Sequence, residues 1–263
     1  MTGFDPNVRP VAGLARPASV LLTGASGGIG LAMLRDLLAN VHVGTVHAVS
    51  RSASSHAALA ALADVHGARL RRIDADLAHD HGFGALLDGL DGTGELDLVV
   101  NATGLLHDRM VAPEKSIEQV SRDALEAVFA INAFAPVLLA RTLMPRLAGR
   151  RPAVFASLSA RVGSIGDNRA GGWYAYRASK AAQNQLMRTF AIEWRRRNPL
   201  GTCLLLHPGT VDTALSAPFQ SRVPAHRLFD PASAAGKLLR VIASSSPADT
   251  GRFVAWDGTD IPW

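Results

Sequence analysis

A tyrosine and a lysine four positions apart, Tyr176 and Lys180, carry the clearest chemical signal in this 263-residue chain. This spacing places both side chains on one face of a helix. A phenol with its usual pKa of about 10 is a poor acid–base catalyst at neutral pH, and a nearby ammonium lowers that pKa by favouring the phenolate. The pair therefore suits proton transfer to or from a substrate oxygen. Taken alone, the spacing also fits a solvated surface pair.

A glycine-rich segment, residues 23–30, supplies the second signal. It follows a short apolar run that predicts a buried strand, and it precedes a helical pattern of apolar residues that runs to Leu38. A strand, a glycine turn and a helix in this order form a dinucleotide-binding unit, in which the helix N-terminus faces the phosphates. Glycine is needed there because the turn takes unusual backbone angles and approaches a pyrophosphate closely. A tight loop without a ligand is the alternative.

Strand and helix patterns alternate along the rest of the chain. The predicted strands are residues 20–22, 45–50, 70–74, 96–100, 153–158, 202–206 and 252–256. The predicted helices include 57–63, one through 83–87, 121–146, 174–197 and 231–244, and Pro136 is expected to kink the third of these just after Asn132. The alternation predicts an α/β fold, a Rossmann-type doubly wound parallel sheet of about seven strands with helices on both faces. Ligands of such sheets bind at the carboxyl ends of the strands.

The domain organisation follows from the absence of repeats and of breaks in composition. Residues 19–263 are predicted to form one dinucleotide-binding domain. Residues 1–18 contain three prolines and no periodicity, so we expect a flexible N-terminal extension without the apolar core of a secretory signal. The irregular stretch 214–229 is expected to form a wall or a lid of the substrate pocket.

Composition excludes several function classes. The 27 basic and 22 acidic residues give a formal charge of +5, but the basic residues are scattered, which does not favour nucleic acid. No run of eighteen or more uncharged apolar residues occurs, so no transmembrane helix is predicted. The single cysteine, Cys203, cannot form an internal disulfide and fits a reducing, cytoplasmic location. The nine histidines lack metal-ligand spacing, so no metal site is predicted.

These motifs together resemble the short-chain dehydrogenase/reductase family. Residues 23–30, Asp76, 101–104, Asn132, Tyr176 with Lys180, and 208–213 appear in the order and approximate spacing of that family. Three further stretches, 163–168, 171–180 and 251–258, resemble its C-factor/sniffer-type carbonyl reductase branch.

The resemblance implies a role for each matched residue. Tyr176 would donate or take the proton, Lys180 would tune it and bind the nicotinamide ribose, and Asn132 would hold a water in a proton relay. Besides Tyr176 and Lys180, the cofactor would be bound by Gly24, Ser26, Gly28, Ile29, Gly30, Asp76, Leu77, Asn101, Ala102, Gly104, Pro208, Gly209, Val211 and Thr213. Two structural alternatives remain open, with Asn132 as a polar residue at a helix kink and Asp76 as a helix N-cap.

The serine that polarises the substrate carbonyl in this family has no clear counterpart. Counting back from Gly163, its position is occupied by Ala160, whereas Ser159 ends the predicted strand. We predict that Ser159 fills the role through a register shift of one residue. Ser164 follows the glycine and should lie outside the strand. The alternative is that Ser159 is a turn residue and another donor polarises the carbonyl.

The end of the second predicted strand favours NADP over NAD. Enzymes of this fold that prefer NAD usually place an acidic residue there, but this chain has Arg51 and no carboxylate in residues 49–52. A guanidinium at this place can meet the 2′-phosphate of NADP. The residue before Gly28, often basic in NADP enzymes, is only Gly27.

The sequence thus predicts an NADPH-dependent oxidoreductase that reduces a small ketone or aldehyde by hydride transfer, with Tyr176 as proton donor. One alternative is an NAD-dependent alcohol dehydrogenase. Another is a dinucleotide-binding signalling or regulatory protein with little turnover, which the C-factor resemblance implies. The family resemblance also implies a homodimer or homotetramer. The expected ligand is a small carbonyl or alcohol substrate, and no binding to nucleic acid or to a membrane is expected.

Overall fold

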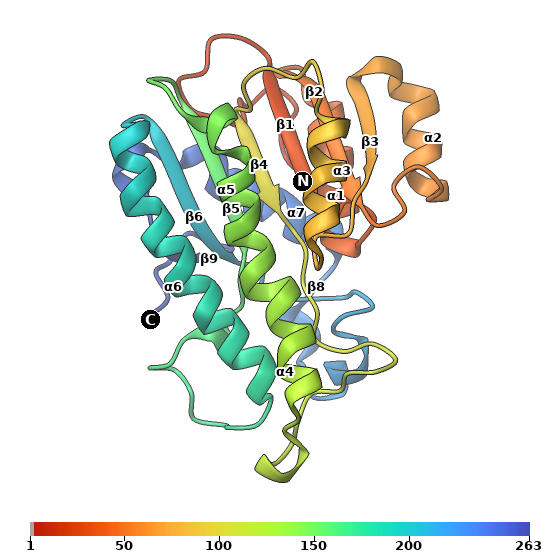
Figure 1. Ribbon diagram of the computed structural model, residues 1–263, viewed down its shortest axis with the longest axis vertical. Coiled ribbons are helices and arrows are strands. Elements are labelled where there is room, and N and C mark those ends of the chain that lie inside the picture. The colour runs from red at the N-terminus through yellow and green to blue at the C-terminus, as the bar shows by residue number, and fades with distance from the viewer. Residues whose placement is uncertain (1–2) are drawn as a thin grey trace.

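The computed structural model describes residues 3–263, which form a seven-stranded parallel sheet with helices on both faces (Figure 1). The strand order is β3-β2-β1-β4-β5-β6-β9, and each neighbouring pair is parallel. The chain builds outward from β1 to β3 and then crosses back to β4. The order in which the chain adds strands therefore reverses between β1 and β4. Doubly wound sheets bind their ligands at such a switch point. The predicted fold class is confirmed.

The elements lie close to their predicted positions. The strands are β1 (Ala18–Thr23), β2 (Val43–Ser50), β3 (Leu70–Asp74), β4 (Leu98–Asn101), β5 (Ala153–Leu158), β6 (Gly201–His207) and β9 (Arg252–Ala255), with β7 (Thr210–Val211) and β8 (Leu228–Phe229) forming a separate pair. The helices are α1 (Gly28–Ala39), α2 (Ala57–His66), α3 (Asp80–Gly89), α4 (Arg122–Phe129), α5 (Ala135–Leu147), α6 (Tyr174–Arg197) and α7 (Pro231–Ser244). Short 3₁₀ helices are η1 (Gly67–Arg69), η2 (Ile117–Gln119), η4 (Arg161–Gly163), η5 (Ala217–Arg222), η6 (Ala225–Arg227) and η7 (Pro247–Asp249).

Two apolar layers hold the helices on the sheet. Alternate residues of β1 enter different layers, so Val20 and Leu22 pack with α1 and α7 while Leu21 packs with α3, α5 and α6. All three side chains are fully buried. Because both faces are covered, the strands are nearly continuous apolar runs, as is usual for a buried parallel sheet. In Figure 1 the long helices α5 and α6 lie side by side in front of the sheet, and α7 lies behind it.

The predicted kink in the long helix is a π-helical turn. Residues Ala130–Phe134 (η3) separate α4 from α5 and contain Asn132. Pro136 has no N–H, so it cannot donate to the carbonyl of Asn132, the residue four positions earlier. Single π-helical turns occur frequently at functional sites. Within the described chain, the joined stretch Arg122–Leu147 is the one helix long and apolar enough to span a membrane, but its buried residues pack into the core beneath it.

The N-terminal segment is packed, although the sequence predicts a flexible extension. Residues 3–17 contain no helix or strand, yet Phe4, Val11 and Leu14 are buried in the core layer shared with α1. The Asn40 side-chain amide donates to two backbone carbonyls of this segment, at 2.9 and 3.2 Å. Three apolar side chains spaced along an irregular segment leave no periodic signal, so their burial could not be predicted from pattern alone.

Candidate active site

The helix α6 carries the two residues with the clearest chemistry. Tyr176 lies in its first turn and Lys180 one turn later, and both side chains are buried. The Lys180 ammonium nitrogen lies 5.9 Å from the centroid of the Tyr176 ring. The prediction that Tyr176 and Lys180 share one helix face is therefore confirmed. Because both side chains are buried, the alternative of a solvated surface pair is excluded.

Burial dominates the electrostatics of this pair. It raises the pKa of the Tyr176 phenol above its ordinary value and lowers the pKa of Lys180 to about 7. Burial disfavours the charged form of each group. The predicted lowering of the phenol pKa by the ammonium is therefore not seen in the protein alone, because desolvation of the buried phenol raises its pKa. At neutral pH the phenol is protonated and can act as a proton donor.

A buried hydrogen-bond network surrounds Lys180. Its ammonium donates to the Leu158 carbonyl at 3.0 Å and to the Gln183 side-chain oxygen at 2.9 Å. The Gln183 amide nitrogen in turn donates to Ser157 Oγ at 2.8 Å. Sequence reasoning missed Gln183 and Ser157. Gln183 is a polar residue on the buried face of α6, three positions after Lys180, and that spacing was the available signal.

The network continues to the switch point through Asn101 at the end of β4. The Asn101 amide nitrogen donates to Ser157 Oγ at 2.9 Å, and its oxygen accepts from the hydroxyls of Thr23 at 2.7 Å and Thr103 at 2.6 Å. Asn101 and Thr23 are fully buried. The side chain predicted to flank the cofactor thus ties β1, β4 and β5 together at the edge where a ligand would bind.

The Asn132 side chain is fully engaged by the protein. Its oxygen accepts from the Leu105 N–H at 2.8 Å, and its nitrogen donates to the Leu105 carbonyl at 2.8 Å and to Ser179 Oγ at 3.1 Å. A Cβ atom on Gly104 would lie 3.7 Å from Asn132 Oδ1 and 3.8 Å from Lys180 Nζ. The fold therefore brings Asn132, Gly104 and Lys180 together, as the family resemblance implies.

Two positions in the turn after β1 have no room for a side chain, because backbone atoms of the protein lie too close to them. Gly24 has a left-handed φ of +70°, and a Cβ atom there would lie 2.7 Å from the Ala102 carbonyl oxygen. A Cβ atom on Gly30 would lie 2.1 Å from the Gly24 carbonyl oxygen. Any side chain at either position would clash with backbone atoms. Glycine at position 24 therefore lets the turn lie close to the end of β4.

The helix α1 that follows this turn begins without a side-chain cap. Its N-cap, Gly27, offers no side chain, and the first turn contains no acidic residue. The first N–H groups of a helix have no intrahelical partner and attract anions. Ser26, Gly28 and Ile29 lie in this segment and are partly or fully exposed. A phosphate group fits this helix end.

Residues 208–213 lie over the glycine turn. A Cβ atom on Gly28 would meet Thr213 Cγ2 at 2.5 Å. Gly209 has a φ of +80°, and a Cβ atom there would lie 2.7 Å from the Phe229 ring. Val211 is buried in β7, and Pro208 precedes the turn at the end of β6. The structure therefore places the two predicted cofactor segments against each other.

Asp76 and Leu77, which the family resemblance assigns to the cofactor, lie after β3. The Asp76 carboxylate accepts from the Ala78 N–H at 3.1 Å, and α3 begins only at Asp80 with His79 as N-cap. Asp76 is therefore not the helix N-cap, which was its structural alternative. The Leu77 side chain is buried in the core.

The end of β2 carries the residues on which the predicted choice between NADP and NAD depends. Arg51 is exposed directly after Ser50, whose buried hydroxyl has no protein partner. Sequence reasoning missed Asp74, a carboxylate that lies beside Ser50 in the β2–β3 register. The Asp74 carboxylate accepts from both the N–H and the hydroxyl of Ser54, and these hydrogen bonds lower its pKa. This carboxylate is thus already satisfied by the protein, whereas Arg51 forms no ion pair among the described residues.

Ser159 is directed away from Tyr176. Its hydroxyl donates to Asn184 Oδ1 at 2.6 Å. Asn184 is eight residues beyond Tyr176, which corresponds to about 12 Å along the helix axis. Ala160, by contrast, packs in the apolar cluster that includes Tyr176. The structure therefore gives no geometric support to the prediction that Ser159 polarises a substrate carbonyl, because its hydroxyl is already donated to Asn184. Ser164 is buried and accepts from the Asp167 N–H at 3.2 Å.

Aromatic rings surround the Tyr176 side chain. Trp173 makes edge-to-face contacts with Tyr176 at 6.2 Å and with Phe219 at 4.9 Å between ring centroids. Leu215 joins the same cluster. Phe219 and Leu215 both belong to the stretch 214–229, so this stretch packs beside the phenol.

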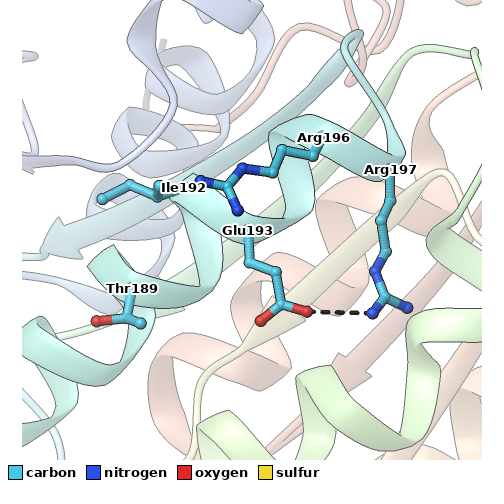
Figure 2. A pocket seen from close by; sticks show the side chains of 5 residues that line it. All are labelled: Thr189, Ile192, Glu193, Arg196 and Arg197. Carbon is cyan, nitrogen blue, oxygen red and sulfur yellow. Dashed lines mark hydrogen bonds and ion pairs between the residues drawn. The ribbon is translucent and has the colours of Figure 1, made fainter.

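A surface hollow lies far from these residues. It is lined by Thr189, Ile192, Glu193, Arg196 and Arg197 near the C-terminal end of α6, where Glu193 pairs with Arg197 (Figure 2). Arg197 is 21 residues beyond Tyr176, or about 30 Å along the helix. This hollow contains none of the predicted site residues.

Comparison with known proteins identifies relatives for most of the chain. Residues 18–223 match the family model of short chain dehydrogenases. The C-signal of Myxococcus xanthus is 34% identical over 172 residues, which cover 65% of this chain and 95% of that protein. The benzil reductase ((S)-benzoin forming) of Bacillus subtilis is 29% identical over 208 residues, covering 76% of this chain and 77% of that protein.

Solved structures show the same architecture. The NADPH-bound carbonyl reductase from chicken fatty liver has a TM-score of 0.83 and 28% identity, with 94% of this chain and 100% of that chain covered. A short-chain dehydrogenase/reductase from Burkholderia multivorans with bound NADP has a TM-score of 0.75, 28% identity and the same coverage of 94% and 100%.

Proposed function

This chain belongs to the short-chain dehydrogenase family of oxidoreductases, and we propose that it is an NADPH-dependent reductase of small ketones or aldehydes. One observation carries the proposal. A buried, protonated phenol, Tyr176, stands beside Lys180 at the switch-point edge of a sheet that also bears a glycine turn. A pure dinucleotide-binding protein has no need for such a proton donor.

The residues present fit a nicotinamide dinucleotide. The open N-terminus of α1 would hold the pyrophosphate, Asn101 would lie along the cofactor, and the segment ending at Thr213 would cover the nicotinamide end. When bound, the reduced cofactor would supply a hydride to the substrate carbon. Arg51, the unpartnered Ser50 hydroxyl and the satisfied Asp74 carboxylate support NADP over NAD. The NADPH bound to the chicken fatty liver carbonyl reductase and the NADP bound to the Burkholderia multivorans short-chain dehydrogenase/reductase agree with this choice.

Proton delivery is the task of α6. The Tyr176 phenol, kept protonated by burial, would donate to the carbonyl oxygen of the substrate. The resulting phenolate would be stabilised by the Lys180 ammonium, 5.9 Å from the ring centroid. With a pKa of about 7, Lys180 can also pass a proton on. The backbone carbonyl of Asn132 cannot accept from Pro136, which has no N–H, so this carbonyl is a suitable acceptor for a relay water.

A signalling role is the second candidate, because the match to the Myxococcus xanthus C-signal covers 95% of that protein. The two functions make different demands on the site. Signalling through cofactor or partner binding would not require the Tyr176 hydroxyl, whereas reduction of a carbonyl would.

Consumption of NADPH and NADH, measured against a panel of aldehydes, ketones and aromatic 1,2-diketones, tests the proposal. We expect NADPH-dependent reduction of at least one compound, and a fall in turnover of about 10²–10⁴-fold for Tyr176→Phe with cofactor affinity retained. Full activity in Tyr176→Phe would remove this residue from the mechanism. A wild-type protein that binds NADPH but reduces no carbonyl in the panel would favour the signalling role.

A further inference from the structure

The start of α6 has an unusual cap. The N-cap residue is Trp173, whose backbone is left-handed with φ +53° and whose side chain caps nothing. It is the one residue other than glycine with a positive φ among residues 3–263. Bulky residues rarely adopt this conformation, so surrounding contacts must hold it in place. The helix that carries Tyr176 thus begins at a strained residue that cannot satisfy its first N–H groups.

Glu114, about sixty residues earlier in the chain, supplies the missing cap. Both oxygens of its carboxylate lie 3.3 Å from the Ala175 N–H nitrogen, and its backbone carbonyl accepts from the Trp173 N–H at 2.6 Å. Glu114 is 2% exposed. One residue therefore holds the N-cap and the second helical residue of α6 at the same time, and Tyr176 follows directly.

Within residues 3–263, the Glu114 carboxylate interacts with the N-terminus of α6 and not with a basic side chain. Among the described residues no arginine, lysine or histidine forms an ion pair with it. A buried carboxylate needs hydrogen bonds and a favourable field, and a helix N-terminus offers both. Glu114 also fixes the loop after β4 against α6, since that loop passes from Asn101 through Leu105 to this residue.

We propose that Glu114 is a positioning residue, whose buried carboxylate and carbonyl hold the first turn of α6 and so fix the Tyr176 phenol for proton donation. This inference rests on the proposed reductase function. Tyr176 lies in the turn that Glu114 holds, whereas Lys180 lies one turn further and is held separately by Leu158 and Gln183. Loss of the cap should therefore affect proton donation more than cofactor binding.

The variants Glu114→Ala and Glu114→Gln test the proposal in the full-length protein. We expect Glu114→Ala to lower kcat by about tenfold or more, a loss on the scale of one helix cap, while the Kd for NADPH changes by less than about threefold. Glu114→Gln keeps an oxygen that can accept from the Ala175 N–H, so it should retain kcat within about threefold of wild type. Ser121→Ala is the matched control, because Ser121 caps α4 through the Ala124 N–H and that helix carries neither Tyr176 nor Lys180.

Hydrogen exchange provides a readout that needs no turnover. Amides of residues 173–178 should exchange faster in Glu114→Ala, with residues 181–197 unchanged and Glu114→Gln close to wild type. Unchanged exchange in 173–178, or a proportional loss of kcat and NADPH affinity in both Glu114 variants, would overturn the proposal. A wild-type protein without any reductase activity would instead refute the proposed function, and the exchange result would still decide whether Glu114 holds this turn.

Discussion

The Lys180 ammonium donates to the Gln183 side-chain oxygen at 2.9 Å, and both side chains are buried on the same face of α6. Gln183 connects this charge to Ser157 on β5, and Asn101 on β4 connects to the same serine hydroxyl. The position of the ammonium is thus fixed from two strands of the sheet as well as from its own helix. This relationship makes Gln183 a determinant of where the positive charge stands relative to Tyr176.

Replacement of Gln183 by leucine should impair both cofactor binding and turnover. The variant removes an acceptor from a buried ammonium, and a hydrogen bond to a charged group contributes about 1.5–3 kcal/mol. We expect the Kd for NADPH to rise and kcat to fall, each by roughly tenfold, in fluorescence titrations and steady-state kinetics. Gln185→Leu is the control, because Gln185 is exposed and its side chain hydrogen-bonds to Thr189 of the same helix. Equal effects of the two substitutions would contradict the role of Gln183.

The choice between NADP and NAD can be tested at Arg51. Arg51→Asp should weaken NADPH binding by more than about 1 kcal/mol, since a charge-assisted contact to the 2′-phosphate would be lost, and should change NADH binding little. Isothermal titration with both cofactors gives the comparison. Arg196→Asp provides the same charge reversal at the far end of α6, where Figure 2 shows this side chain. An equal loss of affinity for both cofactors in Arg51→Asp would disprove the assignment.

The direction of the Ser159 hydroxyl leads to opposite expectations for two neighbouring residues. Ser159→Ala should lower the free energy of unfolding by about 1–3 kcal/mol, because Asn184 loses its buried partner, while turnover stays nearly unchanged. Ala160→Ser adds a hydroxyl beside Tyr176 and should raise turnover severalfold if the site lacks a donor for the oxyanion. Thermal unfolding and kinetics on both variants separate these effects. A large loss of turnover in a stable Ser159→Ala protein would restore the role that the sequence predicts for Ser159.

A buried histidine should make the fold sensitive to acid. Burial, followed by the nearby charges of Arg71 and Arg146, lowers the pKa of His47 on β2 to about 4. In the unfolded chain His47 binds a proton at the ordinary histidine pKa of 6.5. The contribution of His47 to the free energy of unfolding is therefore fully present above about pH 6.5 and is lost as the pH falls towards 4. A displacement of this size corresponds to about 3 kcal/mol.

The variant His47→Leu should flatten that loss, because leucine cannot take up a proton. Urea unfolding between pH 4 and 7 measures the slope for wild type, His47→Leu and the exposed control His81→Leu. We expect the shallower slope only in His47→Leu. His207, whose pKa burial also lowers to about 4, accounts for part of the slope that remains. An identical pH dependence in wild type and His47→Leu would show that His47 is already protonated or accessible in the folded state.

Features encoded over short distances along the chain could be predicted from the sequence. The four-residue spacing of Tyr176 and Lys180 and the strand–turn–helix around Gly24 depend on local backbone geometry, which the residue types specify directly. The alternation of apolar strands and amphipathic helices likewise predicted the doubly wound parallel sheet, because right-handed crossovers leave few other topologies, whereas the strand order and its switch point came from the structure.

Tertiary structure alone decided how these residues are held and charged. The cap that Glu114 places on α6 joins segments about sixty residues apart, and no local pattern marks it. The sign of the Tyr176 pKa shift depends on how completely the folded protein removes water from the phenol, which spacing cannot reveal. The Ser159 hydroxyl donates to Asn184 on α6, a residue 25 positions later in the chain, and no local sequence pattern marks that contact.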